Sequence, residues 1–272
     1  MTKHFWLSLF AFCFSGSVVA EVYQWVDEHG GRHYSDRPNQ QAEIVEIHPG
    51  YTFYRVKYVF DGDTILLENG QKIRFLGINT PEVEGRNKHE EPGGEDAKRW
   101  LAKRLGGQKI RLETDVEKKD KYDRLLAHVF TGSGRHLNLE LVENGLATVN
   151  IYPPNLRYTK ALLQAEERAE RAGIGLWSNP YYARYPFKAL PNRKGWKRVV
   201  GTIKRIKRTR KNNYLIFSDD FSIKIAKQDQ QYFSDLTTYR GKRVEARGWL
   251  SKSRNGYTIR VRHPGHIKFI EE

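Results

Sequence analysis

Three short motifs in the first half of the chain combine the residue types that phosphodiester hydrolysis requires. This reaction brings water to an anionic phosphorus, so its site needs a hard cation, a base and fixed positive groups that stabilise the transition state. The motifs are Asp61-Gly-Asp-Thr64, Arg74-Phe-Leu-Gly-Ile-Asn-Thr-Pro-Glu82 and Asp120-Lys-Tyr-Asp-Arg124. Their carboxylates offer the oxygen ligands that Ca²⁺ and Mg²⁺ prefer, and their arginines stay charged and match two phosphate oxygens at once.

Each motif taken alone also has a purely structural explanation. An Asp-Gly pair is a common hairpin turn. Thr80-Pro81-Glu82 has the composition of a helix start, with threonine as the N-cap and proline in the first turn. The run from Asp120 to Arg124 is typical of a solvated charged loop. Residue types alone leave these alternatives open.

In order and spacing, the three motifs together resemble the micrococcal (staphylococcal-type) thermonuclease family, whose pattern is Asp-Gly-Asp-Thr, then Arg-x5-Thr-Pro-Glu, then Asp-Lys-Tyr-x-Arg. The likeness continues as far as Ser178, through the segments 137–147, 152–155 and 173–178. The resemblance implies a calcium-dependent nuclease of low sequence specificity, with products that end in 3′-phosphate. Mg²⁺ is the less favoured metal.

The same resemblance implies a metal site built on the first two motifs. Asp63 would bind calcium directly, together with the side chain of Asn79 and the backbone carbonyl of Thr80, while Asp61 would lie nearby as a water-mediated partner. One departure matters, because Asn79 stands where the best-known family members carry aspartate. An amide still supplies an oxygen ligand but no charge, so we expect weaker calcium binding than a carboxylate would give.

Catalytic and substrate-binding roles follow from the resemblance as well. Glu82 would position or deprotonate the attacking water, and Arg74 and Arg124 would hold the phosphate and stabilise the five-coordinate transition state. The segment before Tyr152, the expected base-stacking residue, is one residue shorter than the family pattern. The further substrate contacts implied are a terminal-phosphate pair, Lys121 and Tyr122, and a base-stacking residue, Tyr152.

Hydrophobic periodicity predicts the elements that position these residues. Alternating apolar residues favour strands at 52–60, 63–68, 71–77, 108–115 and 124–131, and helical spacing appears at 94–105, 137–144 and 159–172. Gly173 is the expected left-handed cap of the last helix. Five strands with helices packed on them predict an α+β domain built on a five-stranded OB-fold barrel.

Charge separates the last part of the chain from the rest. The formal net charge is +15, and residues 190–272 carry 21 Lys and Arg against 7 Asp and Glu, whereas residues 21–189 are neutral overall. Such a surplus indicates a polyanionic partner. Strands expected at 198–207, 213–218, 221–226, 242–250 and 256–262, with a helix at 228–237, resemble a second, small all-β OB-like domain.

Basic and aromatic residues alternate in this second domain, which suits a nucleic-acid platform where cations follow the backbone and rings stack on bases. The alternative is that the rings form the strand core and the cations are merely solvated. The candidates for substrate binding are Lys204, Arg205, Lys207, Arg208 and Trp249, with Arg210, Lys211, Tyr214, Phe217 and Tyr257 interleaved.

The N-terminus reads as a secretory signal peptide over residues 1–20, an apolar run from Phe5 that ends in small residues before cleavage after Ala20. This run of sixteen residues is too short for a membrane span of about 20. The single cysteine, Cys13, lies inside it, so the mature chain would carry no thiol. Residues 21–50 resemble a small hairpin module of unknown function found at the start of many secreted bacterial proteins.

The expected organisation is therefore a signal peptide at 1–20, an N-terminal module at 21–50, a nuclease domain at 51–180, a linker at 181–195 and a basic domain at 196–272. We expect a secreted or periplasmic monomer, free of the membrane after cleavage, that hydrolyses DNA and/or RNA.

The alternative is a non-catalytic secreted nucleic-acid-binding protein, which the presence of all four residues Asp63, Arg74, Glu82 and Arg124 disfavours. A structural protein of the cell envelope has no support beyond the N-terminal module. No zinc-type His/Cys spacing or Ser/His/Asp set occurs.

Overall fold

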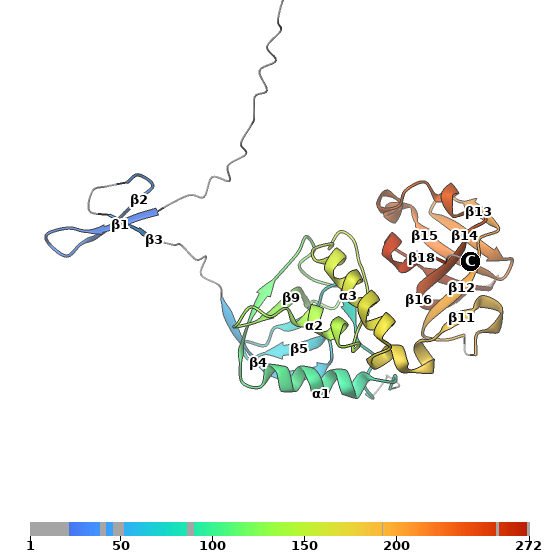
Figure 1. Cartoon of the computed structure of the whole chain (residues 1–272), viewed down its shortest axis with the longest axis horizontal. Coiled ribbons are helices and arrows are strands. Elements are labelled where there is room, and N and C mark those ends of the chain that lie inside the picture. Colours follow the sequence, from blue (N-terminus) through green and yellow to red (C-terminus); the bar gives the residue numbers. More distant parts are fainter. Residues whose placement is uncertain are drawn as a thin grey trace, which may run out of the picture. The chain divides into compact units, whose positions relative to one another are not determined.

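The described residues form two compact units, one within residues 1–51 and one within residues 52–272 (Figure 1). The structure is a computed structural model that describes residues 22–38, 42–45, 52–85, 90–191, 193–253 and 256–270. The expected signal peptide lies outside these ranges. In the first unit, β1 (Val22–Val26) is the central strand between β2 (Arg32–Ser35) and β3 (Glu43–Val45). The hairpin of β1 and β2 matches the sequence expectation, whereas the third strand was not predicted.

A closed five-stranded barrel forms the first half of the second unit, with the strand order β4-β5-β6-β9-β8. Strands β6 and β9 are parallel and the other neighbours are antiparallel. This confirms the predicted OB-type barrel. Its strands are β4 (Phe53–Asp61), β5 (Thr64–Leu67), β6 (Lys72–Phe75), β8 (Lys109–Glu113) and β9 (Leu125–Thr131).

Three helices cover this barrel, and they lie where helical spacing predicted them: α1 (Gly94–Leu105), α2 (Leu137–Glu143) and α3 (Thr159–Ala172). Helix α3 ends at Gly173 with a positive φ of 62°, as expected for a left-handed cap. Alternate strand residues such as Ile65, Ile73 and Ile110 are fully buried in one core with Leu101 of α1. Short strands β7 (Ile78–Asn79) and β10 (Thr148–Val149) pair beside the barrel.

The basic segment forms an eight-stranded sheet with the order β11-β12-β16-β17-β15-β14-β13, and β18 pairs with β16. Strands β15 and β17 are parallel, as are β6 and β9 of the barrel, so both halves follow the OB strand order. The strands are β11 (Arg184–Pro186), β12 (Trp196–Thr202), β13 (Arg205–Arg208), β14 (Asn212–Ser218), β15 (Phe221–Ala226), β16 (Arg243–Ser253), β17 (Gly256–Arg260) and β18 (Ile267–Phe269).

The single helix predicted at 228–237 is wrong. Two 3-10 helices, Lys227–Tyr232 and Leu236–Tyr239, take its place. Asp235 separates them, because its carboxylate accepts the backbone N–H of Thr237 at 3.0 Å and starts a new helix there.

Residues 181–195, read from the sequence as a linker, are largely ordered by aromatic packing. The segment includes part of the 3-10 helix Pro180–Tyr182, then β11, which pairs with β12, and the 3-10 helix Phe187–Ala189. Tyr182 is buried in a small core with Leu176 and Trp196. The connection between the two domains is therefore part of their packed interface.

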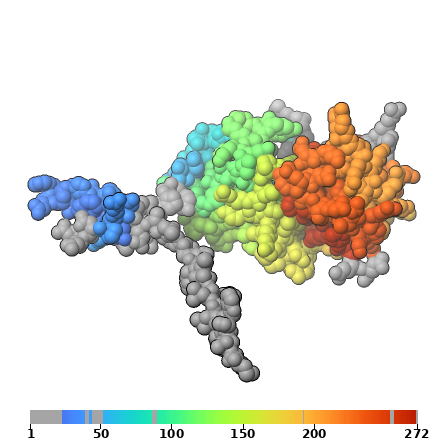
Figure 2. Space-filling model, turned by 90° about the horizontal axis from the view of Figure 1, so that it is seen from above, coloured from blue at the N-terminus to red at the C-terminus, as the bar shows by residue number. Residues whose placement is uncertain are grey.

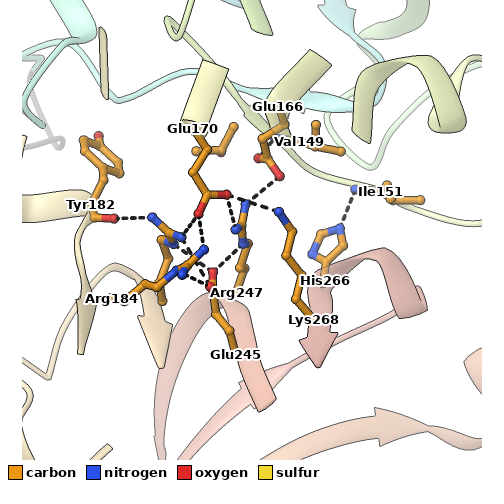
Figure 3. A network of polar contacts seen from close by, with 12 residues as sticks. Val149, Ile151, Glu166, Glu170, Tyr182, Arg184, Glu245, Arg247, His266 and Lys268 are labelled. Carbon is orange, nitrogen blue, oxygen red and sulfur yellow. Dashed lines mark hydrogen bonds and ion pairs between the residues drawn. The ribbon is translucent and has the colours of Figure 1, made fainter. Parts of the chain in front are cut away.

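Buried ion pairs fasten α3 to the sheet of the C-terminal domain (Figure 3). Arg247 of β16 contacts Glu166 at 2.8 Å and Glu245 at 2.6 Å, and it also pairs with Glu170. Arg198 of β12 lies 2.8 Å from Glu245 and pairs with Glu170 as well. Since each buried charge has an opposite partner, the network favours one docking geometry over others.

Two further contacts belong to this interface. Lys268 of β18 lies 3.1 Å from Glu170, and the backbone N–H of Ile151 donates to Nε2 of His266 at 3.1 Å. In Figure 2 the yellow atoms of the α3 region lie directly against the orange and red atoms of the C-terminal domain.

Candidate active site

A cavity of about 750 Å³ opens where the β4–β5 turn, β6, β7 and the loop before β9 meet. The structure brings every residue predicted from the thermonuclease-like motifs to this one place. The predicted residues that line it are Asp61, Asp63, Arg74, Asn79, Thr80, Glu82, Lys121, Tyr122, Arg124, Tyr152 and Trp249.

Asp63 is the buried carboxylate of the site, with 4% of its surface exposed. Its Oδ2 accepts the backbone N–H of Thr80 at 2.9 Å and forms a 2.9 Å ion pair with Nη2 of Arg74, while Oδ1 accepts the Thr64 hydroxyl at 3.0 Å. Burial raises the pKa of Asp63 to about 6, the positive charge of Arg74 opposes this rise, and the charge of Asp61 adds to it.

Gly62 explains why the turn before Asp63 has this shape. A Cβ at position 62 would lie 2.6 Å from both Ala97 of α1 and the side chain of Thr80. The turn therefore packs against the first helix at a distance that only glycine allows. Asp61 stabilises the same turn, because its Oδ1 accepts the backbone N–H of Asp63 at 3.0 Å.

The guanidinium of Arg74 is held by four acceptors. Nη1 donates to the carbonyls of Phe75 at 2.6 Å and Ile78 at 3.0 Å. Nη2 donates to Oδ1 of Asn79 at 3.1 Å and pairs with Asp63. Because only a two-residue turn separates β6 from β7, the carbonyls and the amide that orient this arginine belong to one continuous segment.

The oxygens expected to bind calcium converge in this structure. Asp63 Oδ2 and Asn79 Oδ1 both contact the same nitrogen of Arg74, so the two oxygens already surround a position that attracts positive charge. Nδ2 of Asn79 donates to the carbonyl of Thr80 at 2.9 Å, so the amide of Asn79 links this carbonyl to the Arg74 contact. Carboxylate, amide and carbonyl oxygens are ligands that suit Ca²⁺.

Within the described ranges, no group of three His, Cys, Asp or Glu side chains could hold a metal ion. The donor set that fits a hard cation therefore depends on the amide of Asn79 and the carbonyl of Thr80 in addition to the carboxylates.

Asp120 organises the loop that carries Arg124. Its Oδ2 accepts Nε of Arg124 at 2.7 Å, and its Oδ1 accepts the backbone N–H groups of Tyr122 at 2.9 Å and Arg124 at 3.1 Å. Burial acts to raise the pKa of Asp120, but these hydrogen bonds and the charge of Arg124 hold it below its usual value. Sequence reasoning assigned Asp120 no role, although its spacing of four residues from Arg124 was the available signal.

Glu82 lies on the irregular segment after β7, half-buried at the cavity. Its backbone N–H donates to Oε2 of Glu91 at 3.2 Å. Thr80-Pro81-Glu82 does not begin a helix, because the next helix is α1, which starts at Gly94. The helix-cap explanation of this motif is therefore wrong.

The structure divides the candidates of the basic domain between two places. Arg205 and Lys207 line a separate groove of about 260 Å³ together with Tyr214 and Tyr257. Trp249 instead lines the cavity of the nuclease motifs. Lys204 is exposed, and Arg208 lies 3.7 Å from Asp235. Phe217 is fully buried in the domain core, so its proposed place among base-stacking rings is wrong.

Comparisons with known proteins agree with this geometry. Residues 72–179 match the family described as staphylococcal nuclease homologue, and residues 9–52 match a domain of unknown function, DUF4124. The chain is 40% identical over 127 residues to a thermonuclease of Staphylococcus intermedius, covering 46% of this chain and 75% of that protein. It is 37% identical over 129 residues to a thermonuclease of Staphylococcus hyicus, covering 46% and 76%. Endonuclease YncB of Bacillus subtilis is 36% identical over 127 residues, covering 45% and 60%.

A closed OB-type barrel with a buried carboxylate and arginines in one cavity, together with these relatives, defines a nuclease that hydrolyses phosphodiester bonds. The chain belongs to the staphylococcal nuclease, or thermonuclease, family.

Proposed function

We propose that this protein is a secreted, calcium-dependent nuclease that cuts DNA and/or RNA with low sequence specificity. The observation that carries the proposal is the single cavity that gathers Asp63, Arg74, Glu82 and Arg124 from separate segments. A nucleic-acid-binding protein without activity would have no need of a carboxylate base beside two arginines. That reading remains the alternative outcome of the experiment below.

In the proposed mechanism, the phosphate of the substrate lies between Arg74 and Arg124, whose fixed donors stabilise the charge that develops in the transition state. Asp120 positions Arg124 through the hydrogen bond to Nε. Glu82 orients the attacking water and accepts its proton.

Asp63, Asn79 and the carbonyl of Thr80 would hold the calcium ion, with Asp61 reached through water. When bound, calcium supplies a hard positive charge that polarises the phosphate and offsets the charge of the transition state. Nη2 of Arg74 now contacts the two side-chain oxygens, of Asp63 and Asn79, that would hold the ion. Arg74 would therefore exchange these contacts for contacts with the phosphate.

The C-terminal domain is proposed to hold the substrate. The net charge of its segment, and the groove that places Arg205 and Lys207 beside two tyrosines, suit a single strand whose backbone meets the cations while its bases meet the rings. Deleting residues after Pro191 should raise the Michaelis constant and reduce its dependence on salt.

Location and oligomeric state are further parts of the proposal. The apolar run before Ala20 supports export with cleavage after that residue, to the periplasm or the medium. In the regions that the structure describes, no helix is both long and apolar enough to cross a membrane. We propose that the exported protein acts as a monomer, because both the cavity and the groove are formed within one chain.

The experiment that tests the proposal is digestion of labelled single- and double-stranded DNA and RNA with calcium, with magnesium or with a chelator. We expect cleavage with calcium, weaker cleavage with magnesium and none with chelator. Equal cleavage in chelator would contradict calcium dependence. Binding of all four substrates without cleavage of any would favour the non-catalytic alternative.

A further inference from the structure

The catalytic cavity has a wall that the thermonuclease-like segment does not supply. Trp249 of β16, in the C-terminal domain, lines the cavity together with Asp63, Arg74 and Arg124. Trp249 has 40% of its surface exposed. An exposed indole beside a phosphate-binding site offers a ring face on which a nucleotide base can stack.

A second contact of the C-terminal domain meets the same cavity. The guanidinium carbon of Arg262 lies 4.1 Å from the ring centroid of Tyr152, a residue of the nuclease domain that also lines the cavity and is 46% exposed. At this distance the guanidinium stacks on the ring and fixes its orientation. It also places a cation beside one of the two aromatic residues that line the cavity.

The anchors of the domain interface lie directly beside both aromatic residues. Arg247, which pairs with Glu166, lies two residues before Trp249 on β16, and residues two apart on a strand face the same side. Ile151, whose N–H donates to His266, immediately precedes Tyr152. The buried contacts that dock the domain (Figure 3) therefore also set the positions of the two rings at the cavity.

We propose that Trp249, Tyr152 and Arg262 form a nucleotide-binding subsite that extends the catalytic cavity onto the C-terminal domain. The proposal rests on the nuclease function given above and names how that site takes its substrate. The indole stacks on the base of a nucleotide that flanks the scissile phosphate, and Arg262 faces the neighbouring backbone phosphate. Base-paired nucleotides already stack within the duplex, so the subsite takes an unpaired base, in a single strand or at an opened end.

The test compares Trp249→Ala and Trp249→Phe with the wild-type full-length chain. Two substrates are used with calcium, a single-stranded decanucleotide and a small aryl phosphodiester of thymidine that is too short to reach the indole. The matched control is Phe269→Ala, which removes another exposed aromatic side chain of the same domain, outside the cavity. A fluorescent phosphorothioate strand, titrated in chelator and followed by anisotropy, reports binding without turnover.

We expect Trp249→Ala to raise the KM for the decanucleotide about tenfold more than the KM for the small phosphodiester. The dissociation constant of the phosphorothioate strand should rise in parallel. Trp249→Phe should recover most of both losses because phenylalanine still stacks, and Phe269→Ala should match the wild type. The same strand in a perfect duplex should show a smaller effect of Trp249→Ala.

An equal effect of Trp249→Ala on both substrates, or no effect on the binding of the strand, would overturn the subsite while leaving the nuclease function intact. Failure of Trp249→Phe to recover binding would also count against stacking. A wild type that cleaves neither substrate would refute the proposed function, and the anisotropy titration would then still decide whether Trp249 contacts nucleic acid.

Discussion

Arg74 and Asp63 form a 2.9 Å ion pair inside the catalytic cavity, and both side chains are largely shielded from water. The pair joins the group expected to bind phosphate to the group expected to bind metal. Each therefore restrains the other before substrate arrives, and the arginine offsets part of the cost of burying the carboxylate. This relationship makes the two residues a good place to test the mechanism.

Arg74→Ala should lower kcat/KM about 100- to 1000-fold, because it removes a fixed donor to the transition state. Arg74→Lys should recover little of this loss, since a lysine cannot occupy the four acceptors that hold the guanidinium. Initial rates on single-stranded DNA give the comparison, with thermal unfolding as a check on the fold. Near-wild-type rates for the alanine variant would show that this arginine does not act on the phosphate.

Asn79→Asp should tighten calcium binding, because it adds a negative charge to an oxygen that already faces the same cation-attracting position as Asp63. Calorimetric titration of calcium measures the change. Asn69→Asp is the control, since Asn69 lies in an exposed turn away from the cavity. If both variants bind calcium as the wild type does, the missing charge at position 79 does not weaken calcium binding.

Arg247→Met should destabilise the domain interface by about 3–5 kcal/mol, because it leaves the buried Glu166 without its ion-pair partner and removes one of the cations that balance Glu170 and Glu245. Arg243→Met, on the exposed part of the same strand, should have little effect. Urea unfolding followed by tryptophan fluorescence compares the two variants. Equal stability would mean that the network does not hold the domains together.

Acidification should weaken the same interface through His266. Burial lowers the pKa of His266 to about 3, and the charges of His263, Arg247 and Arg262 add to this. In the unfolded chain the ordinary pKa is near 6.5, so between these values the unfolded state binds the extra proton and stability falls as pH falls. Protonation of Nε2 would also break the hydrogen bond from Ile151.

The measurable consequence is the slope of stability against pH between 6 and 4. His266→Gln should flatten this slope by up to about 1.4 kcal/mol per pH unit relative to the wild type. Glu170 contributes in the same direction, because the charges of Arg247, Arg198 and Lys268 hold its pKa below the usual value despite partial burial. An unchanged slope in the variant would exclude His266 as a source of the acid sensitivity.

The barrel and its catalytic motifs could be predicted because local signals carried them. Apolar residues alternate with polar ones in β6, where Ile73 and Phe75 are buried on either side of Arg74. Such alternation defines a strand with one face in the core. The same strand then delivers Arg74 to the cavity. The positions of Asp63 and Arg124 followed equally from motifs whose residues are close in sequence.

Features that depend on contacts between distant segments could not be predicted. Trp249 and Phe217 are both strand aromatics. Phe217 is buried in the core of its own domain, whereas Trp249 lines the cavity because the two domains dock. Residues 181–195 looked like a linker because the burial of Tyr182 depends on Trp196 and Leu176. The strand β3 is three residues long and is defined only by its pairing with β1.

The measurement that tests the central claim most directly is the rate of DNA hydrolysis with calcium by Glu82→Gln beside Glu84→Gln. The two carboxylates are two residues apart, but Glu82 lines the cavity while Glu84 is exposed and does not. We predict that Glu82→Gln loses about 100- to 10,000-fold in kcat, while Glu84→Gln stays near the wild type. Equal rates for the two variants would contradict the assignment of this cavity as the catalytic site.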